Sequence, residues 1–537
     1  MEKHRNECQK LFLLILQVGL LITMSLVSLP RQGNAAEINR GGTMMVALTA
    51  DPPSINAGIT TDIAALNLSG QVYSTIIRAN ADGDLLPYLA KSWSMSPDGK
   101  TYTFKFFENI KWHDGQPFSS DDVAWSLLEV NRKYNGMAST AFAMVKEIET
   151  PDKYTAVFKL EYPYPPFLRS LTDFGSAAIL PKHIFEGTDP LKNPHNFKPI
   201  GTGPFVFKEY EKGSHIIFER NPNFHLKGLP YLDRLVFQII PNAAARGLAL
   251  EKGSIDFLPY YSVSLAECAR LGKLPSITVA APRRIVAGIW IAFANLRNPI
   301  LAKKEVRQAI YYALDRQELL EKAGFGYGKV SAGPISSELK PFYTDKGHQY
   351  PYNPKLAEEM LDAAGYPRKA DGMRFSIRLS YFTGLAPLEP TSKLMLIQLN
   401  KVGIGVQITP MDSGAWRDIV FKNWDFDITM GSFQTGTDPA IGVERLYICK
   451  NIQRLFARNV SGYCNPELDE VFAKAAKELN EEKRVALYHE AVRILCEDVP
   501  AFWLWDRSYP IAYNAKLKGL PQDETQYGPF LEVWWEK

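Results

Sequence analysis

The side chains that could carry out chemistry do not form the pattern of an enzyme. None of the eight histidines lies in a metal-binding helix pattern, and neither a Cys-x-x-Cys pair nor a Gly-x-Ser-x-Gly turn occurs. His113 stands beside Asp114, but neighbours just ahead of a helix cap are typical of a turn. Gly324, Gly326 and Gly328 follow an expected helix instead of opening one, which disfavours a nucleotide loop. The sequence therefore predicts a protein that is not an enzyme and holds no cofactor or metal.

The cysteines indicate a protein made for an oxidising compartment. Cys449 and Cys464 enclose a short polar loop, and we expect a disulfide there that would stabilise the fold by about 3 kcal/mol. Cys268 and Cys496 lie in helical patterns, where buried thiols are expected.

Length and composition predict a globular protein of more than one lobe. The 537 residues exceed the roughly 250–300 at which a single hydrophobic core stops growing. Charged residues make up 22% and hydrophobic residues 46%, which is ordinary for a folded protein. The net charge of +3 falls to about +1 without the first 36 residues, so the charge balance does not indicate nucleic acid as a partner.

Residues 1–36 have the features of a cleaved export signal. A basic start ending at Lys10 precedes the mostly apolar run Leu11–Leu29, and Ala35-Ala36 offers a cleavage site. The alternative is a permanent membrane anchor, but polar residues dilute the apolar run. Cys8 lies ahead of that run, where no lipid would be attached, so we expect a soluble periplasmic protein.

The elements that must position a site alternate between strands and helices. Phe205–Tyr210 and His215–Arg220, joined by Lys212-Gly213, predict a hairpin, and Leu235–Ile240 predicts a strand buried on both faces. The strand Arg374–Tyr381 leads through a helix into another strand, which implies a parallel crossover. The other expected elements are strands Thr43–Leu48, Leu89–Trp93, Thr101–Phe107, Tyr154–Leu160, Ile255–Leu258, Gly288–Asn295, Ile404–Ile408, Asp425–Met430 and Ala501–Trp505, and helices Asp121–Arg132, Ala243–Leu250, Lys304–Leu314, Thr391–Val402, Glu467–Leu479 and Glu481–Glu497.

Four blocks of sequence resemble one family. In chain order they are Leu89–Val123, Pro199–Gln238, Asn295–Arg316 and Tyr463–Asp469. Together they are similar to the solute-binding proteins of the peptide, nickel and opine class of ABC importers. The resemblance implies an α/β, two-lobed periplasmic-binding-protein fold with mixed sheets, connected by a hinge, in which the larger lobe carries an extra subdomain.

The resemblance also implies domain boundaries. The signal peptide would be residues 1–36, and the large lobe would be discontinuous, formed by 37–72, 198–288 and 508–537. The extra subdomain would be 73–197 and the second lobe 289–507.

The family's ligand-binding residues can be matched to positions of this sequence only in part. Peptide binders of this class hold the ligand's ammonium with an aspartate in a G-W-x-x-D-x-x-[DE]-P pattern. The same nine positions run here from Gly431 to Pro439, with Ser432 in place of the tryptophan and Thr435 in place of the aspartate. The arginine that holds a dipeptide's carboxylate falls, by approximate alignment, at Gly384. Tight binding of free dipeptides is therefore not expected.

Seven residues are candidates for the ligand site. Asp438 could replace the ammonium anchor, or it could cap a helix that begins with Pro439. Phe433 and Trp416 could offer an aromatic lining, or they could belong to the core. Ser54 lies in a Pro-rich loop at the carboxyl end of a strand, where ligands bind in open α/β sheets, although a simple turn is the alternative. The full set is Phe433, Gln434, Thr435, Asp438, Trp416, Asn295 and Ser54.

The expected function is that of a periplasmic receptor for peptides. It would bind its solute between two closing lobes and deliver it to permease subunits in the inner membrane, which work with separate ATPase subunits. We expect a monomer without nucleic acid. The alternatives are a receptor for an opine-like or glycoside-like solute, an exported hydrolase and a periplasmic chaperone.

Overall fold

The computed structural model describes residues 38–80, 83–172, 176–281, 287–383, 385–436, 438–508, 510–520 and 528–537. Within these ranges, Arg40–Trp535 forms one compact unit. The expected signal peptide (residues 1–36) and Gly384 lie outside the described residues.

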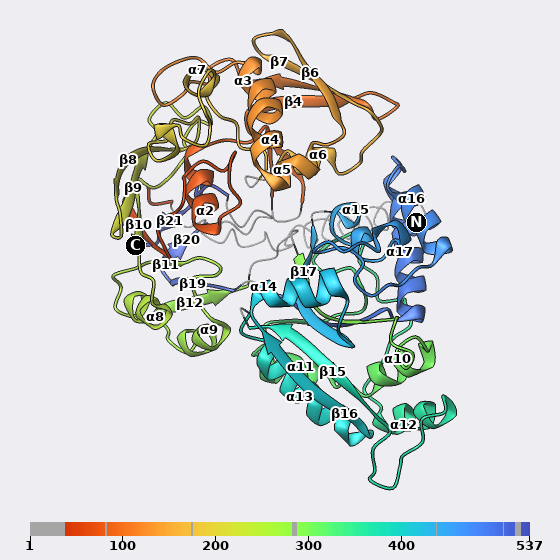
Figure 1. Cartoon of the computed structure of the whole chain (residues 1–537). Coiled ribbons are helices and arrows are strands. Elements are labelled where there is room, and N and C mark those ends of the chain that lie inside the picture. Colours follow the sequence, from red (N-terminus) through yellow and green to blue (C-terminus); the bar gives the residue numbers. More distant parts are fainter. Residues whose placement is uncertain are drawn as a thin grey trace, which may run out of the picture. The chain divides into compact units, whose positions relative to one another are not determined.

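The first sheet has seven strands in the order β12-β19-β11-β1-β10-β9-β8 (Figure 1). The predicted hairpin is confirmed, because β8 and β9 pair in antiparallel register. Only one face of β10 is fully buried, since Val236 and Gln238 stay half-exposed, so the expectation of a strand buried on both faces is wrong. The strands are β1 (Thr43–Leu48), β8 (Phe205–Glu211), β9 (His215–Arg220), β10 (Arg234–Ile239), β11 (Phe257–Leu258), β12 (Ile277–Ala280) and β19 (Ile511–Asn514).

The second sheet has six strands in the order β14-β18-β13-β17-β15-β16. The predicted parallel crossover is confirmed, because β15 and β16 pair in parallel and the connecting helix α13 packs on both. Figure 1 shows α13 alongside these two strands. The strands are β13 (Ala287–Ala294), β14 (Gly328–Val330), β15 (Phe375–Phe382), β16 (Ile404–Met411), β17 (Ile428–Gly436) and β18 (Ala501–Arg507).

The chain passes between these two sheets twice. It leaves the first sheet after β12 and enters the second at β13. It returns from β18 to β19 in the first sheet. β13 and β18 are antiparallel neighbours, so the two crossing strands support each other with a shared ladder of hydrogen bonds.

A third sheet of four antiparallel strands has the order β4-β5-β7-β6. The turn at Pro97-Asp98-Gly99 joins β4 to β5, which pair in antiparallel register. Each of the three sheets lies against its own cluster of buried apolar side chains. The strands are β4 (Ala90–Met95), β5 (Thr101–Phe106), β6 (Val145–Asp152) and β7 (Thr155–Leu160), and the short strands β2 (Ile77–Ala79) with β3 (Leu85–Pro87) and β20 (Leu517–Lys518) with β21 (Trp534–Trp535) form two further pairs.

Several helices begin at a capping side chain. Asp315 accepts a hydrogen bond from the Glu318 amide at the start of α11, and Asn353 caps α12 in the same way. The helices are α2 (Ile63–Val72), α3 (Ser120–Trp125), α4 (Arg132–Tyr134), α5 (Gly136–Ala141), α6 (Phe167–Ser170), α7 (Lys182–Phe185), α8 (Ala243–Glu251), α9 (Leu265–Leu271), α10 (Lys304–Tyr312), α11 (Arg316–Ala323), α12 (Pro354–Ala363), α13 (Leu388–Lys401), α14 (Ser413–Trp416), α15 (Pro439–Gly442), α16 (Pro466–Ala475) and α17 (Glu481–Asp498), with π-helical turns at Ser126–Asn131 and Arg417–Asn423.

One strand is longer than its sequence predicts. A strand ending at Met430 and followed by a loop was the expectation, but β17 continues to Gly436. The antiparallel partner β13 explains the difference, because it pairs with β17 as far as Ala287 opposite Gly436. The two glycines of this stretch, Gly431 and Gly436, are weak strand formers, and a neighbouring strand that offers its hydrogen bonds overrides that weak preference.

Candidate functional site

The segment that corresponds to the peptide binders' ligand pattern is the second half of β17 and the turn into α15. Side chains alternate along this strand, as the pleat requires. Phe433 and Thr435 are buried, whereas Ser432 is half-buried and Gln434 is exposed. The exposed side of this segment is therefore the one that carries Ser432 and Gln434.

Phe433 and Trp416 lie in the core beneath this segment. Phe433 is 6% exposed and Trp416 is 2% exposed. The Trp416 Nε1 donates to Thr429 Oγ1 at 2.9 Å, and both rings pack around Phe421. Phe456, which is 47% exposed, closes this aromatic cluster toward solvent. A ligand role for Phe433 and Trp416 stays a prediction.

Asp438 makes a buried ion pair. Its carboxylate accepts from both terminal nitrogens of Arg484, at 2.7 and 2.6 Å, and the two side chains are only 3% and 6% exposed. The same carboxylate accepts from the Ala440 amide and so caps α15. Asp438 is thus oriented by a helix end and neutralised by an arginine from α17, which makes it a poor anchor for a second cation.

Glu444 lies beside this ion pair. Its Oε1 accepts from the Tyr488 hydroxyl at 2.8 Å, and Arg484 also donates to that hydroxyl oxygen. Burial raises the pKa of Glu444 to about 7, and the negative charge of Asp438 acts in the same direction. The cluster therefore places Glu444, an acid that changes protonation near neutral pH, beside a buried ion pair.

Three further candidates have structural partners. The Asn295 amide nitrogen donates to the carbonyls of Trp424 and Phe426, at 3.0 and 2.8 Å. Ser54 Oγ accepts from the Asn56 amide at 2.9 Å, which is turn geometry. Thr435 is 4% exposed near the end of β17. These contacts explain why the residues are ordered, and a role in ligand binding stays a prediction for each.

Cys449 and Cys464, the pair expected from the sequence, are joined as a disulfide with a Cα–Cα distance of 4.6 Å. The bridge closes the segment that follows α15 and ends just before α16. Cys268 and Cys496 are buried free thiols, also as expected.

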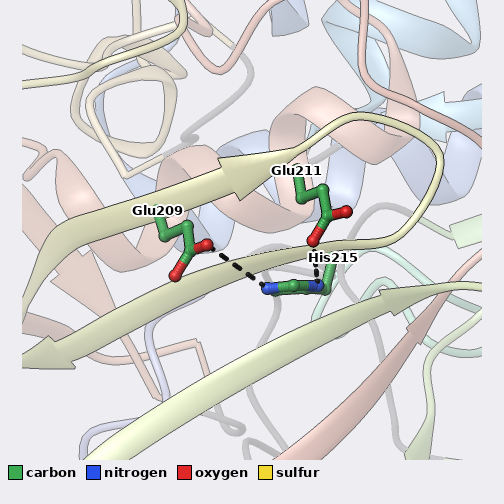
Figure 2. Close-up of side chains that lie close together, drawn as sticks. All are labelled: Glu209, Glu211 and His215. Atoms are coloured by element: carbon green, nitrogen blue, oxygen red, sulfur yellow. Dashed lines mark ion pairs between the residues drawn. The ribbon is translucent and has the colours of Figure 1, made fainter.

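Two acidic side chains and a histidine lie close together on the hairpin of the first sheet. Figure 2 shows Glu209 and Glu211 of β8 beside the ring of His215, with carboxylate oxygens 4.0 Å from Nε2 and 3.7 Å from Nδ1, respectively. Ser214 Oγ also lies 2.8 Å from Nδ1. Because the two carboxylates approach different ring nitrogens, the three side chains do not converge on one point, and we assign no metal to them.

A groove of about 930 Å³ lies between α16 and α17. None of the seven candidate residues lines it. Five of its nine lining residues are charged, and most of the nine are exposed on the surface of the two helices. The lining residues are Glu470, Ala473, Lys474, Lys477, Glu478, Leu479, Lys483, Ala486 and Leu487.

Sequence reasoning missed two arginines. Arg484 lies in α17, 46 residues from Asp438. In the sequence it looks no different from the other charged residues of that helix. Arg507 ends β18, and its side chain contacts Ser432 on β17. The position of Arg507 at the end of a crossing strand is the one signal that could have drawn attention to it.

Two mixed sheets between which the chain passes twice define a class, the two-lobed periplasmic-binding-protein fold, and this confirms the expected fold class. The chain belongs to the bacterial extracellular solute-binding proteins of family 5, whose "Middle" region matches residues 84–453. This also confirms the family expected from the sequence. In the described part of the chain, none of the helices has the length and apolar character needed to span a membrane.

Known proteins resemble the chain over almost its whole length. The oligopeptide-binding protein AppA of Bacillus subtilis (strain 168) is 29% identical over 521 residues, covering 94% of this chain and 93% of AppA. The solved structure of AppA from Bacillus subtilis in complex with a nonapeptide has a TM-score of 0.71 at 27% identity and covers 93% of this chain and 100% of that one. The ABC transporter substrate-binding protein CtaP from Listeria monocytogenes has a TM-score of 0.80 at 25% identity, with the same coverage.

Proposed function

We propose that this protein is the peptide-binding receptor of an ABC importer. The observation that carries the proposal is the similarity to an oligopeptide-binding protein across more than nine-tenths of both chains. A match of that extent includes both large sheets and the strands that cross between them. The solute would bind between the lobes and shift the population toward a closed form that docks on the permease.

The ligand is a peptide longer than a dipeptide. Thr435 offers a hydroxyl where a charged anchor would be needed for an ammonium group, and Asp438 already neutralises Arg484. A dipeptide enclosed in a closed site would leave its ammonium group without a strong partner, which is costly. A longer peptide can place its termini elsewhere and pair its backbone with exposed strand edges.

The remaining parts of the proposal follow from this role. The protein is exported to the periplasm after cleavage near residue 36, acts as a monomer without catalysis, and docks on permease subunits that have separate ATPase subunits. The division into lobes at 37–72, 198–288 and 508–537 against 289–507, with 73–197 as a subdomain, is supported by the way the three sheets divide the chain.

Calorimetry with purified protein, stripped of ligand by unfolding and refolding, tests the proposal. The titrants are a dipeptide, a randomised octapeptide pool and an opine, and tryptophan emission reports lobe closure. We expect saturable binding and an emission change with the octapeptides, and much weaker binding of the dipeptide. Binding of the opine alone, or cleavage of the peptides detected by mass spectrometry, would contradict the proposal. Submicromolar binding of the dipeptide would contradict the expected ligand length.

A further inference from the structure

Arg507 is surrounded by hydroxyl groups. Its Nη1 donates to Ser432 Oγ at 3.2 Å, and its Nη2 donates to the hydroxyls of Tyr260 and, at 3.2 Å, Tyr261. Ser432 is on β17, whereas the tyrosines follow β11 in the first sheet. The hydrogen bonds of this guanidinium thus join both sheets at the point where β18 ends and the chain crosses between them.

Aromatic rings hold the guanidinium in place. Its carbon lies 5.3 Å from the centre of the Trp290 ring and 5.5 and 5.6 Å from those of Tyr261 and Tyr260. These distances are within the range of a cation–π interaction. The surrounding rings limit the conformations of the arginine, so little additional ordering is required when it binds a partner.

Glycines flank Arg507 in the second sheet. In the second sheet Arg507 pairs with Gly288 on one side and Gly328 on the other, and Gly288 also pairs with Gln434. Directly paired residues point to the same face of a sheet, so glycines flank Arg507 in a row that ends at the exposed Gln434. A side chain at Gly328 could not be accommodated, because its Cβ would lie 2.3 Å from the Asp506 carbonyl oxygen.

Tyr261 has a strained backbone at the exposed edge of this group. Its φ is +71°, a region that a bulky residue rarely adopts, and its side chain is 37% exposed. Strain of this kind is retained where the surrounding structure imposes it, and it is concentrated at ligand clamps. Arg507 itself is half-buried and donates to the exposed Tyr261, so this is the side from which a ligand could approach.

We propose that Arg507, Tyr260 and Tyr261 bind a carboxylate of the peptide ligand. The proposal rests on the proposed function, which supplies the peptide. The acceptors named above are neutral, and a carboxylate that replaces one of them forms charge-assisted bonds of about twice the strength. The planar guanidinium can hold both carboxylate oxygens, while a tyrosine hydroxyl turns to donate to one of them. The carboxylate is either the peptide's C-terminus or an acidic side chain.

Two pairs of hexapeptide libraries distinguish these sources. The first pair is randomised without Asp or Glu and carries either a free C-terminal carboxyl or an amide. The second pair is amidated throughout and has either Glu or Gln at one internal position. Protein is mixed with equal amounts of both members of a pair, and retained peptides are identified by mass spectrometry.

The wild-type protein should retain the carboxylate member of one pair about 10- to 100-fold more than its neutral member. Arg507→Gln should abolish this preference, and Arg507→Lys should restore part of it, because lysine keeps the charge but lacks the planar fork. Arg493→Gln, which removes an exposed arginine that pairs with Glu490 on α17, is the control and should keep the full preference. Tyr261→Phe, which keeps the ring, should weaken the preference and serves as the test if Arg507→Gln does not fold.

The outcomes separate this inference from the proposed function. Retention of peptides without a preference for carboxylates, or an undiminished preference in Arg507→Gln, would overturn the carboxylate site and leave a peptide receptor. If no peptide of either pair is retained, the peptide receptor fails and the carboxylate site fails with it.

Discussion

At the scale of single residues, the buried pair of Asp438 and Arg484 contributes to stability in a direct way. Two charges out of water are costly unless each satisfies the other, and here two hydrogen bonds of 2.7 and 2.6 Å do so. Arg484 donates a further hydrogen bond to the Ala475 carbonyl at 2.9 Å, which connects α16, α17 and the start of α15. The pair therefore fixes the position of the segment that follows β17.

We predict that Asp438→Asn will lower stability markedly. Asparagine can still cap α15, but it removes the charged partner that accepts two hydrogen bonds from the buried Arg484, and breaking a buried ion pair costs about 3–5 kcal/mol. Denaturant unfolding followed by circular dichroism measures the change. Glu470→Gln, which breaks an exposed pair with Lys474, is the matched control and should cost less than about 1 kcal/mol. A normal stability of Asp438→Asn together with a large loss of ligand affinity would show that Asp438 is a ligand anchor instead.

We also predict that Glu444 makes the protein less stable as the pH rises. Its folded-state pKa is raised from 4.5 to about 7 by burial, so the folded protein holds a proton that the unfolded chain releases. Folding stability should therefore fall between about pH 4.5 and 7, by up to about 1.4 kcal/mol per pH unit from this group. Glu444→Gln keeps an oxygen for the Tyr488 hydroxyl and removes the titration.

Melting temperatures of the wild-type protein and Glu444→Gln, measured from pH 4.5 to 8, test this. The melting temperature of the variant should rise relative to that of the wild-type protein as the pH increases to about 7. Above that pH the difference should stay constant. Parallel curves over the whole range would show that Glu444 titrates at an ordinary pKa.

At the scale of elements, the segment between α15 and α16 depends on its disulfide. The bridge closes a loop with a sequence separation of 15, and cross-linking a loop of that size stabilises by about 3 kcal/mol through the unfolded chain. The double variant Cys449→Ser/Cys464→Ser should melt at a lower temperature than the wild-type protein. A reductant should lower the wild-type melting temperature by a similar amount and leave the variant unchanged. If the reductant lowers both equally, the effect does not come from this bridge.

At the scale of the whole molecule, the chain passes between the two large sheets twice, through the link from β12 to β13 and the link from β18 to β19. Arg507 stands at the second of these links. Its hydrogen bonds with Tyr260, Tyr261 and Ser432 would therefore depend on the relative position of the two sheets and also on whether a carboxylate is bound.

Export is a further prediction at this scale. Expression of all 537 residues in a Gram-negative host should yield a periplasmic protein that begins near Glu37, because the basic start, apolar run and Ala35-Ala36 are typical of a cleaved signal. Intact-mass measurement of the periplasmic fraction locates the new N-terminus. Full-length chain recovered with the membranes would show that the segment is an anchor.

Local patterns in the sequence were enough to predict many elements. β15 alternates apolar and polar residues, Lys212-Gly213 makes a tight turn between β8 and β9, and Asp315 and Asn353 cap the helices that follow them. Each of these depends on residues within a few positions of one another, so the physics that forms them is visible in the sequence. The order of four family blocks predicted the fold class for a different reason, since it draws on the whole chain.

The tertiary structure decided what depends on distant residues. Asp438 is neutralised by Arg484, 46 residues further on, and β17 extends to Gly436 because β13 lies beside it. Trp416 and Phe433 lie in the core because rings from several elements enclose them. By itself, the sequence determined that a strand, a cap and an aromatic lining were available here. Which charges were already paired, and which rings were already buried, depended on contacts between segments that only the folded chain brings together.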